Sequence, residues 1–170
     1  VAMPCPISRW GTLTVTTASG CNWTATSNDS WITVTTGATG TGNGTATYSL
    51  AANLSIVART GTLTVAGQTV TITQAGAPCT YTVSPTSASA AATASTATVT
   101  VTTLAGCNWS AVSNSTWLSI TSGSGGSGSG TVSYSVAANT ALTPRTGTLT
   151  VAGQTVTLTQ AAATCTFTAS

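Results

Sequence analysis

Apolar residues alternate with threonine or serine along much of this chain, and this alternation is its most informative local pattern. In Trp10–Thr17, Leu13 and Val15 are separated by threonines, and in Cys21–Ala25 every second residue is apolar. A period of two places successive side chains on opposite faces of an extended strand, so each segment predicts a β-strand with one buried face. No segment has the period of an amphipathic helix, and we therefore expect an all-β fold.

The clearest supersecondary signal is a hairpin. Thr62–Val65 and Gln68–Thr73 alternate in the same way and are joined by Ala66-Gly67, and two strands with a two-residue turn containing glycine form the commonest hairpin. Ser27–Ser30 has the residue types of a turn, and the glycine-rich stretch Gly37–Gly44 is expected to be a loop. Two further strands are expected at Trp31–Thr35 and Thr45–Leu50.

The chain repeats itself with a period of 86 residues. Cys79 and Cys165 have this offset (165 − 79 = 86), and Arg59–Thr71 is identical to Arg145–Thr157. Self-similarity at a fixed period indicates tandem modules, so we expect one domain at residues 1–76 and a second at 77–162. The low-complexity stretch Thr86–Ser95 is expected to be a linker within the second domain. The strands expected there are Cys79–Ser84, Thr96–Thr103, Cys107–Ser113, Trp117–Thr121, Thr131–Ala137, Gly147–Val151 and Gln154–Gln160.

The opening strand of the second domain, Cys79–Ser84, is the segment that breaks the symmetry. Its counterpart in the first domain would begin at 79 − 86 = −7, before Val1, whereas a copy stands at Cys165–Ser170. The segment Val1–Arg9 aligns with the linker Ser87–Ser95 and contains two prolines, which are rare in central strands. We therefore expect a first domain without its opening strand and a spare strand within residues 163–170.

Seven short strands separated by short turns predict an immunoglobulin-like β-sandwich in each domain. Three motifs then resemble the BACON domain family: the run from Cys21 to Val34, Tyr48–Asn53, and Arg59–Gln74, each with a copy 86 residues later. The resemblance implies an immunoglobulin-like fold on secreted or surface bacterial proteins, often in tandem. The family name proposes carbohydrate binding, and a spacer role is equally compatible with it. The first repeat departs from the family pattern, because the opening strand with its cysteine and aromatic residue is absent.

Charged residues are nearly absent, and this excludes several functions. Three arginines and Asp29 are the whole set, and the chain contains no His, Glu or Lys. General acid–base and nucleophilic catalysis need such groups, so we expect no enzymatic activity, no catalytic residues and no cofactor. A calcium site needs several carboxylates, and five cysteines without histidine favour disulfides over zinc, so we expect no metal site. Nucleic-acid binding needs clustered Lys and Arg, so we expect no nucleic-acid partner. No apolar run reaches the roughly 20 residues of a membrane span.

Five cysteines without a CxxC motif favour disulfides and hence an extracellular location. Val1 in place of Met suggests a mature product after removal of a signal peptide, or a fragment. Cys79 begins one strand and Cys107 follows the next, so antiparallel pairing predicts a Cys79–Cys107 disulfide. The equivalent bond of Cys21 would join Cys165 of a neighbouring subunit. The partner of Cys5 stays open, because the strand Trp10–Thr17 spans about 25 Å and places Cys5 far from Cys21.

The tryptophans are the candidate aromatics for binding a sugar or a protein. Trp23 and Trp109 share a strand face with cysteines and are expected in the core beside a disulfide. Trp31 and Trp117 each follow a turn, where packing at the core or edge competes with a role as a binding platform. Trp10 has threonine at the matching position of the second repeat, so a local interface and a simple surface substitution both remain open.

The sequence therefore favours a structural subunit of an extracellular, pilus-like bacterial filament that polymerises head to tail by donor-strand complementation. The subunit's partner is then another copy of itself. The alternative is a fragment of a multi-repeat cell-surface protein that acts as a spacer or carbohydrate-binding module, with glycans as partners. In the filament hypothesis the side chains of Cys165, Phe167 and Ala169 point inward. The residues of the expected donor strand are Cys165, Thr166, Phe167, Thr168, Ala169 and Ser170.

Overall fold

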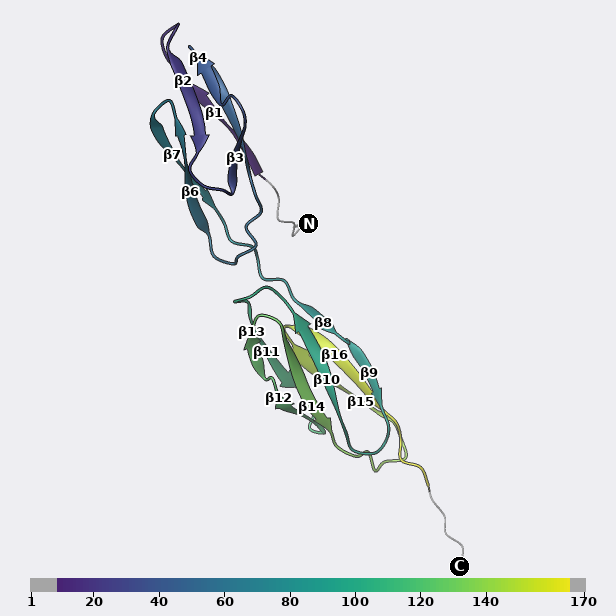
Figure 1. Ribbon diagram of the computed structural model, residues 1–170. Helices are drawn as coiled ribbons and strands as arrows, with labels where there is room; N and C mark the ends of the chain where they lie inside the picture. Colours follow the sequence, from purple (N-terminus) through teal and green to yellow (C-terminus); the bar gives the residue numbers. More distant parts are fainter. Residues whose placement is uncertain (1–8, 166–170) are drawn as a thin grey trace, which may run out of the picture. The chain divides into compact units, whose positions relative to one another are not determined.

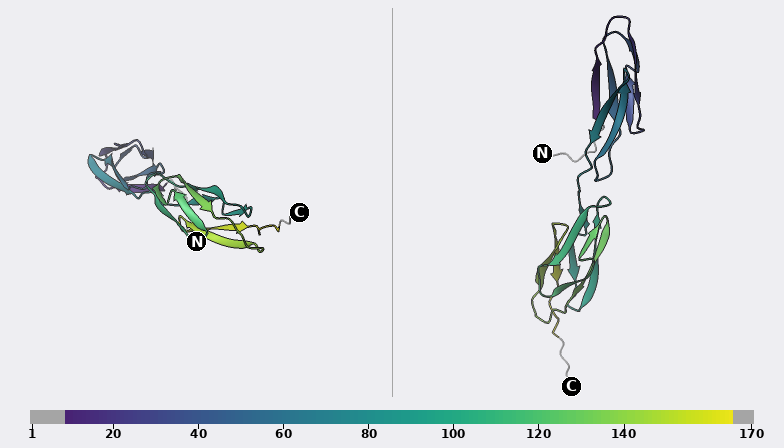
Figure 2. Two further views of the ribbon diagram at one scale, coloured as in Figure 1. Left: turned by 90° about the horizontal axis from the view of Figure 1, so that it is seen from below. Right: turned by 90° about the vertical axis from the view of Figure 1, so that its left-hand side faces the viewer.

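The computed structural model describes residues 9–165 and divides the chain into two compact units, Val1–Pro78 and Cys79–Ser170 (Figure 1). The division falls two residues after the boundary expected from the repeat. Within residues 9–165 the secondary structure consists of sixteen β-strands and no helix, which confirms the all-β prediction. Each unit consists of two sheets, as the different views in Figures 1 and 2 show.

The second unit is a sandwich of a four-stranded and a five-stranded sheet. Every strand pairing in it is antiparallel except that of β16 with β9, which is parallel. The four-stranded sheet has the order β12 (Leu118–Ser122), β14 (Gly130–Val136), β10 (Ser95–Thr102), β8 (Thr82–Ser84). The five-stranded sheet has the order β13 (Gly125–Ser127), β11 (Asn108–Ser113), β15 (Arg145–Val151), β16 (Gln154–Gln160), β9 (Ser87–Ala90).

The first unit has the same arrangement with one strand fewer in each sheet. One sheet has the order β1 (Arg9–Val15), β5 (Gly44–Leu50), β3 (Ile32–Thr36). The other has the order β4 (Thr39–Thr41), β2 (Asn22–Ser27), β6 (Arg59–Val65), β7 (Gln68–Gln74). Matched at the offset of 86 residues, the described part of this unit contains no counterpart of β8 or β9. Strands β1 and β7 are therefore edge strands, whereas their counterparts β10 and β16 are interior.

The inward-facing residues of each unit form one apolar core, as the alternating pattern predicts. In β6 the buried residues Gly61, Leu63 and Val65 alternate with half-exposed threonines. The hairpin between β6 and β7 turns at Ala66 and Gly67, both with positive φ (50° and 75°). Two positive φ angles in succession define the two-residue turn whose twist matches that of paired strands. The hairpin predicted from the sequence is thus present, and the second unit repeats it at Ala152 and Gly153.

The structure corrects two details of the sequence analysis. The glycine-rich stretches expected to be loops contain the short strands β4 and β13, and the expected linker Thr86–Ser95 contains β9. Strand β4 is only three residues long, with Gly40 between two threonines, so it carries no alternation of apolar and polar side chains from which to predict a strand. The glycines serve close packing instead: a Cβ built on Gly40 would lie 2.3 Å from Cζ2 of Trp23. In β4 and β13 alike, a glycine therefore lies against a tryptophan of the paired strand.

Candidate strand-acceptor site in the first unit

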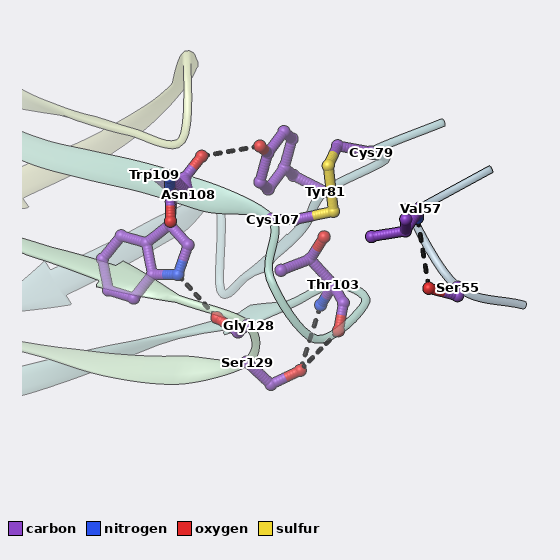
Figure 3. The surroundings of a disulfide bond; sticks show 10 residues. All are labelled: Ser55, Val57, Cys79, Tyr81, Thr103, Cys107, Asn108, Trp109, Gly128 and Ser129. Carbon is purple, nitrogen blue, oxygen red and sulfur yellow. Dashed lines mark hydrogen bonds between the residues drawn. A yellow bond between two sulfur atoms is a disulfide. The ribbon is translucent and has the colours of Figure 1, made fainter. Parts of the chain in front are cut away.

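The opening segment of the second unit is held to the rest of the sandwich at three points. Cys79 forms a disulfide with the buried Cys107, with the two Cα atoms 5.6 Å apart (Figure 3). This is the pair named from the sequence. Val83, in β8, pairs with Val101 in β10 and is buried in the core. The disulfide and this strand pairing fix the two ends of the segment.

Tyr81, between these two residues, provides the third point. Its hydroxyl donates a 2.6 Å hydrogen bond to the main-chain oxygen of Asn108, on β11 of the opposite sheet (Figure 3). Its own main-chain oxygen accepts a 2.7 Å hydrogen bond from Nε2 of Gln154 on β16. The ring packs against the buried core of the unit. The aromatic residue therefore links the opening segment to the sheet opposite β8.

The matching positions of the first unit are uncovered. Cys21, the counterpart of Cys107, is an exposed free thiol, whereas Cys107 is fully buried. Tyr48 is half-buried, whereas its counterpart Tyr134 is 1% exposed. Within residues 9–165, β1 pairs with β5 and with no other strand, so the second edge of β1 offers free main-chain donors and acceptors. An unpaired edge of this kind is a template for another strand.

A cavity of the first unit lies beside Asn22, the counterpart of the residue that accepts the Tyr81 hydroxyl. Its volume is about 340 Å³ and it is open to solvent. The lining includes Asn22, whose counterpart Asn108 accepts the Tyr81 hydroxyl, and Trp23, the counterpart of the core residue Trp109. The lining residues are Thr17, Asn22, Trp23, Thr24, Ala66 and Gly67. Within its described residues, the first unit thus combines an unpaired strand edge at β1, an open cavity beside Asn22 and a free thiol at Cys21.

The residues expected to fill this site lie largely outside the described part of the chain. Cys165 is described and is an exposed free thiol. Residues 166–170, which include Phe167 and Ala169, are not described, and neither is Cys5. The donor-strand assignment and the Cys21–Cys165 bond between subunits therefore remain predictions.

The structure separates the tryptophans into three environments. Trp23 and Trp109 are buried, and each indole N–H donates to a main-chain oxygen, that of Gly42 at 2.9 Å and that of Gly128 at 2.7 Å. Their expected core position is confirmed. Trp10 is on β1, and 79% of its surface is exposed.

Trp31 and Trp117 each stack against an arginine. The guanidinium carbons of Arg59 and Arg145 lie 4.3 Å from the centroids of these rings, a cation–π geometry that occupies one indole face. An open groove of about 520 Å³ in the second unit is lined in part by Trp117, Thr96 and Ser119. Trp10 is the residue of the first unit that corresponds to Thr96. Sequence spacing alone does not show these stacks, because tryptophan and arginine are 28 residues apart (59 − 31 = 28).

Three further features of the described residues concern metal binding, the role of Asp29 and membrane spanning. Residues 9–165 contain no group of three His, Cys, Asp or Glu side chains placed to hold a metal ion. Asp29 accepts a 2.7 Å hydrogen bond from the Thr62 N–H and so fastens the turn before β3 to β6. In the described part of the chain, no helix is long and apolar enough to cross a membrane.

The fold is similar to parts of larger proteins of known structure. A GH5 xyloglucanase of Bacteroides ovatus, solved in complex with a XXXG heptasaccharide, has 20% identity over 49% of this chain, with a TM-score of 0.44. The surface layer protein SbsC, domains 1–6, has 20% identity over 84% of this chain, with a TM-score of 0.41. The match spans 19% and 20% of those two chains, so this chain corresponds to about a fifth of their length. Domains 4 and 5 of the S-layer protein SbsC have 19% identity over 87% of this chain and 74% of that one, with a TM-score of 0.39.

No curated protein matches the chain. A family model does match, and it does so twice, at residues 22–75 and 108–161. The family is BACON, described as "Putative binding domain, N-terminal". The two matches stand at the same 86-residue offset as the sequence repeat (108 − 22 = 86) and together span more than half of the chain. The chain therefore belongs to the BACON family and carries two of its domains in tandem.

Proposed function

We propose that the chain is a structural subunit of an extracellular filament in which Cys165–Ser170 of one subunit completes the first unit of the next. The observation that carries the proposal is the cavity of about 340 Å³ beside the unpaired edge of β1. The corresponding place in the second unit is filled by Tyr81, from a segment with the same sequence pattern as the C-terminal one.

The register of the donor follows from the repeat. At an offset of 86 residues, Phe167 takes the place of Tyr81 in the cavity, and Ala169 takes the place of Val83 beside Val15. Burying a phenylalanine side chain contributes about 1.5–3 kcal/mol, and main-chain hydrogen bonds along the β1 edge add to it. Cys165 then takes the place of Cys79 beside Cys21, so that an oxidising environment makes the link covalent.

The geometry of such an interface is compatible with an open polymer. The donor is on the C-terminal side of one subunit and the acceptor is in the first unit of another, so the contact is heterologous. A heterologous contact generates a ring or a helical filament, depending on the rotation it imposes. Scarce charge is consistent with this assembly, because subunits with few charges repel one another weakly.

The test is disulfide mapping of purified protein under non-reducing conditions, together with negative-stain microscopy. We expect a peptide that joins Cys21 to Cys165, a ladder of multimers that collapses with reductant, and filaments. Cys165→Ala should abolish the covalent ladder, whereas Cys5→Ala, as the matched control, should leave it intact. A discrete monomer that retains a free Cys165 thiol in oxidising buffer contradicts the proposal.

A second candidate is a carbohydrate-binding or spacer module within a longer surface protein, in which a preceding segment completes the first unit. The exposure of Trp10 and the groove beside Trp117 favour sugar binding, because flat aromatic faces can stack on pyranose rings. Glycan-array binding that is lost on replacing Trp31 and Trp117 would support this candidate. Replacing Trp10 alone tests the exposed indole, and binding that persists in all three variants excludes these tryptophans as the platform.

A further inference from the structure

The first unit has a second unpaired edge, in the sheet opposite the donor site. Within residues 9–165, β7 pairs with β6 alone. Its counterpart β16 pairs in addition with β9, in parallel, in a register that joins Thr157 to Ser87 and Gln160 to Ala90. The Ala161 N–H extends this ladder with a 2.9 Å hydrogen bond to the Ala90 oxygen. The edge of β7 thus offers the same main-chain groups without the strand.

The side chains of the two strands show what the missing strand covers. Val156 and Leu158 of β16 are 1% and 3% exposed, whereas the matching Val70 and Ile72 of β7 are only half-buried. The two strands have nearly the same sequence. Gln68–Gln74 and Gln154–Gln160 differ at one position, where Ile72 corresponds to Leu158. The difference in burial therefore comes from the neighbouring strand and not from the sequence of β7.

A buried glutamine at the end of β16 binds the residues that follow β9. Gln160 is fully buried, and its Nε2 donates to the main-chain oxygens of Ala91 (3.0 Å), Ala92 (3.2 Å) and Ala137 (3.0 Å). The matching Gln74 donates to Ala51, the counterpart of Ala137, at 3.0 Å. At the offset of 86 residues, the counterparts of Ala91 and Ala92 are Cys5 and Pro6.

We propose that Val1–Pro4 of the same chain binds along β7 as a parallel edge strand, with the carbonyls of Cys5 and Pro6 on the amide of Gln74. The chain length fits. In the second unit, residues 91–94 connect β9 to β10, and residues 5–8 provide the same four-residue connection to β1 at Arg9. This proposal concerns a different sheet and a different segment from the donor strand, and it stands or falls independently of it.

The residue types of this segment suit the position. Ala2 and Pro4 correspond to Ala88 and Ala90, which are half-buried against the core, and Val1 and Met3 correspond to the exposed Ser87 and Ser89. Proline lacks the main-chain N–H, and at the end of an edge strand this costs at most one ladder hydrogen bond. Pro4 and Pro6, which argue against a central strand, are therefore compatible with an edge strand.

The consequence is that two different segments cover the two edges, the N-terminal segment at β7 and the donor strand at β1. An uncovered edge can pair with any other chain, so a subunit with two open edges in its first unit would associate at both. Covering β7 with the chain's own segment leaves β1 as the edge that accepts a strand. Assembly is then directed to the site with the cavity and the thiol.

The test places two cysteines at matched positions of the full chain, in a background in which Cys5, Cys21 and Cys165 are alanine. Met3 and Thr73 correspond to Ser89 and Thr159, which are Cα partners between β9 and β16, and neighbouring strands lie within disulfide range. Met3→Cys with Thr73→Cys should oxidise to a bond within one chain, seen as a monomer without free thiols at these positions. Met3→Cys with Thr69→Cys, four residues out of register, is the control and should stay reduced. Absence of the bond, or its formation between chains, overturns the proposal.

Amide hydrogen exchange on the unsubstituted chain gives an independent measurement. The proposal expects the Thr73 and Ala75 amides to exchange at least tenfold faster after removal of residues 1–4. The matching Thr159 and Ala161 amides, covered by β9, are the internal reference and should not change. Equal exchange with and without the segment overturns the proposal. Either failure leaves the Cys21–Cys165 test of the donor strand unaffected.

Discussion

The Tyr81 hydroxyl lies 2.6 Å from the main-chain oxygen of Asn108, so an aromatic residue of the opening segment bonds directly to the opposite sheet. The first unit has the acceptor for the same bond in Asn22, beside an open cavity. The proposed donor carries phenylalanine at this position and alanine where the opening segment has Val83. The donor strand therefore lacks one hydrogen bond and some apolar surface that the opening segment has. Substitutions that restore them should strengthen its binding.

Phe167→Tyr should tighten assembly. The new hydroxyl can donate to the Asn22 oxygen as Tyr81 does to Asn108, and such a hydrogen bond is worth about 0.5–1.5 kcal/mol, or roughly 2–12-fold in affinity. The measurement is the protein concentration at half-maximal polymerisation under reducing conditions, where the disulfide does not contribute. Phe167→Leu, which fills less of the cavity, should raise this concentration. An unchanged concentration in both variants argues against Phe167 as the residue that occupies the site.

Ala169→Val should slow the release of subunits. Val83 is 4% exposed and faces Val101, and the corresponding place beside Val15 would gain two methyl groups of buried surface, about 1.6 kcal/mol. Dissociation of preformed filaments after dilution, followed by light scattering, reports the effect. Thr168→Val is the control on the outward face and should dissociate at the original rate.

Cys107→Ala should destabilise a subunit, whereas Cys21→Ala should leave its stability unchanged. The Cys79–Cys107 bond closes a loop of 28 residues, and its loss is expected to cost about 3–4 kcal/mol. Cys21 is exposed and unpaired in the isolated subunit, so its replacement should leave urea unfolding unchanged. A large destabilisation by Cys21→Ala in a monomer would mean that Cys21 has a partner within its own chain.

Gly40→Ala should destabilise the first unit. A Cβ at this position would lie 2.3 Å from the indole of Trp23, so either β4 or the buried ring must shift, a change that costs about 1–3 kcal/mol. Thr39→Ala, on the same strand but exposed, is the matched control and should have little effect. Chemical unfolding followed by tryptophan fluorescence distinguishes the two variants.

The second unit should lose stability at alkaline pH through Tyr134. Burial raises the pKa of this phenol above its ordinary value of 10.0, because the folded core disfavours the phenolate. The contribution to stability is therefore complete below pH 10 and is lost as the pH rises toward the folded pKa, since the unfolded chain releases the proton more readily. Tyr134→Phe should flatten the dependence of unfolding free energy on pH above 10. An unchanged slope would indicate that the phenol ionises without unfolding.

The sequence by itself determined the features that depend on neighbouring residues. Alternation predicted the long strands, the Ala66-Gly67 pair predicted a two-residue hairpin turn, and the 86-residue period predicted two modules of one fold. Cys79 and Cys107 were paired by reasoning about adjacent antiparallel strands. These inferences succeed because strand faces and tight turns are set by the chain over a few residues.

The tertiary structure decided the features that depend on contacts between distant segments. Strands β4 and β13 pair with β2 and β11 and place a glycine against a tryptophan of the paired strand, and one face of Trp31 is occupied because Arg59 stacks on it. Strands β7 and β16, which differ only in Ile72 for Leu158, differ in burial because β9 covers β16. The cavity lies beside Asn22, the counterpart of the residue that accepts the Tyr81 hydrogen bond, and the described part of the first unit contains no counterpart of Tyr81. Burial and cavities depend on which segment packs against a surface. An alternating pattern shows which face of a strand is apolar, but it does not show which segment covers that face.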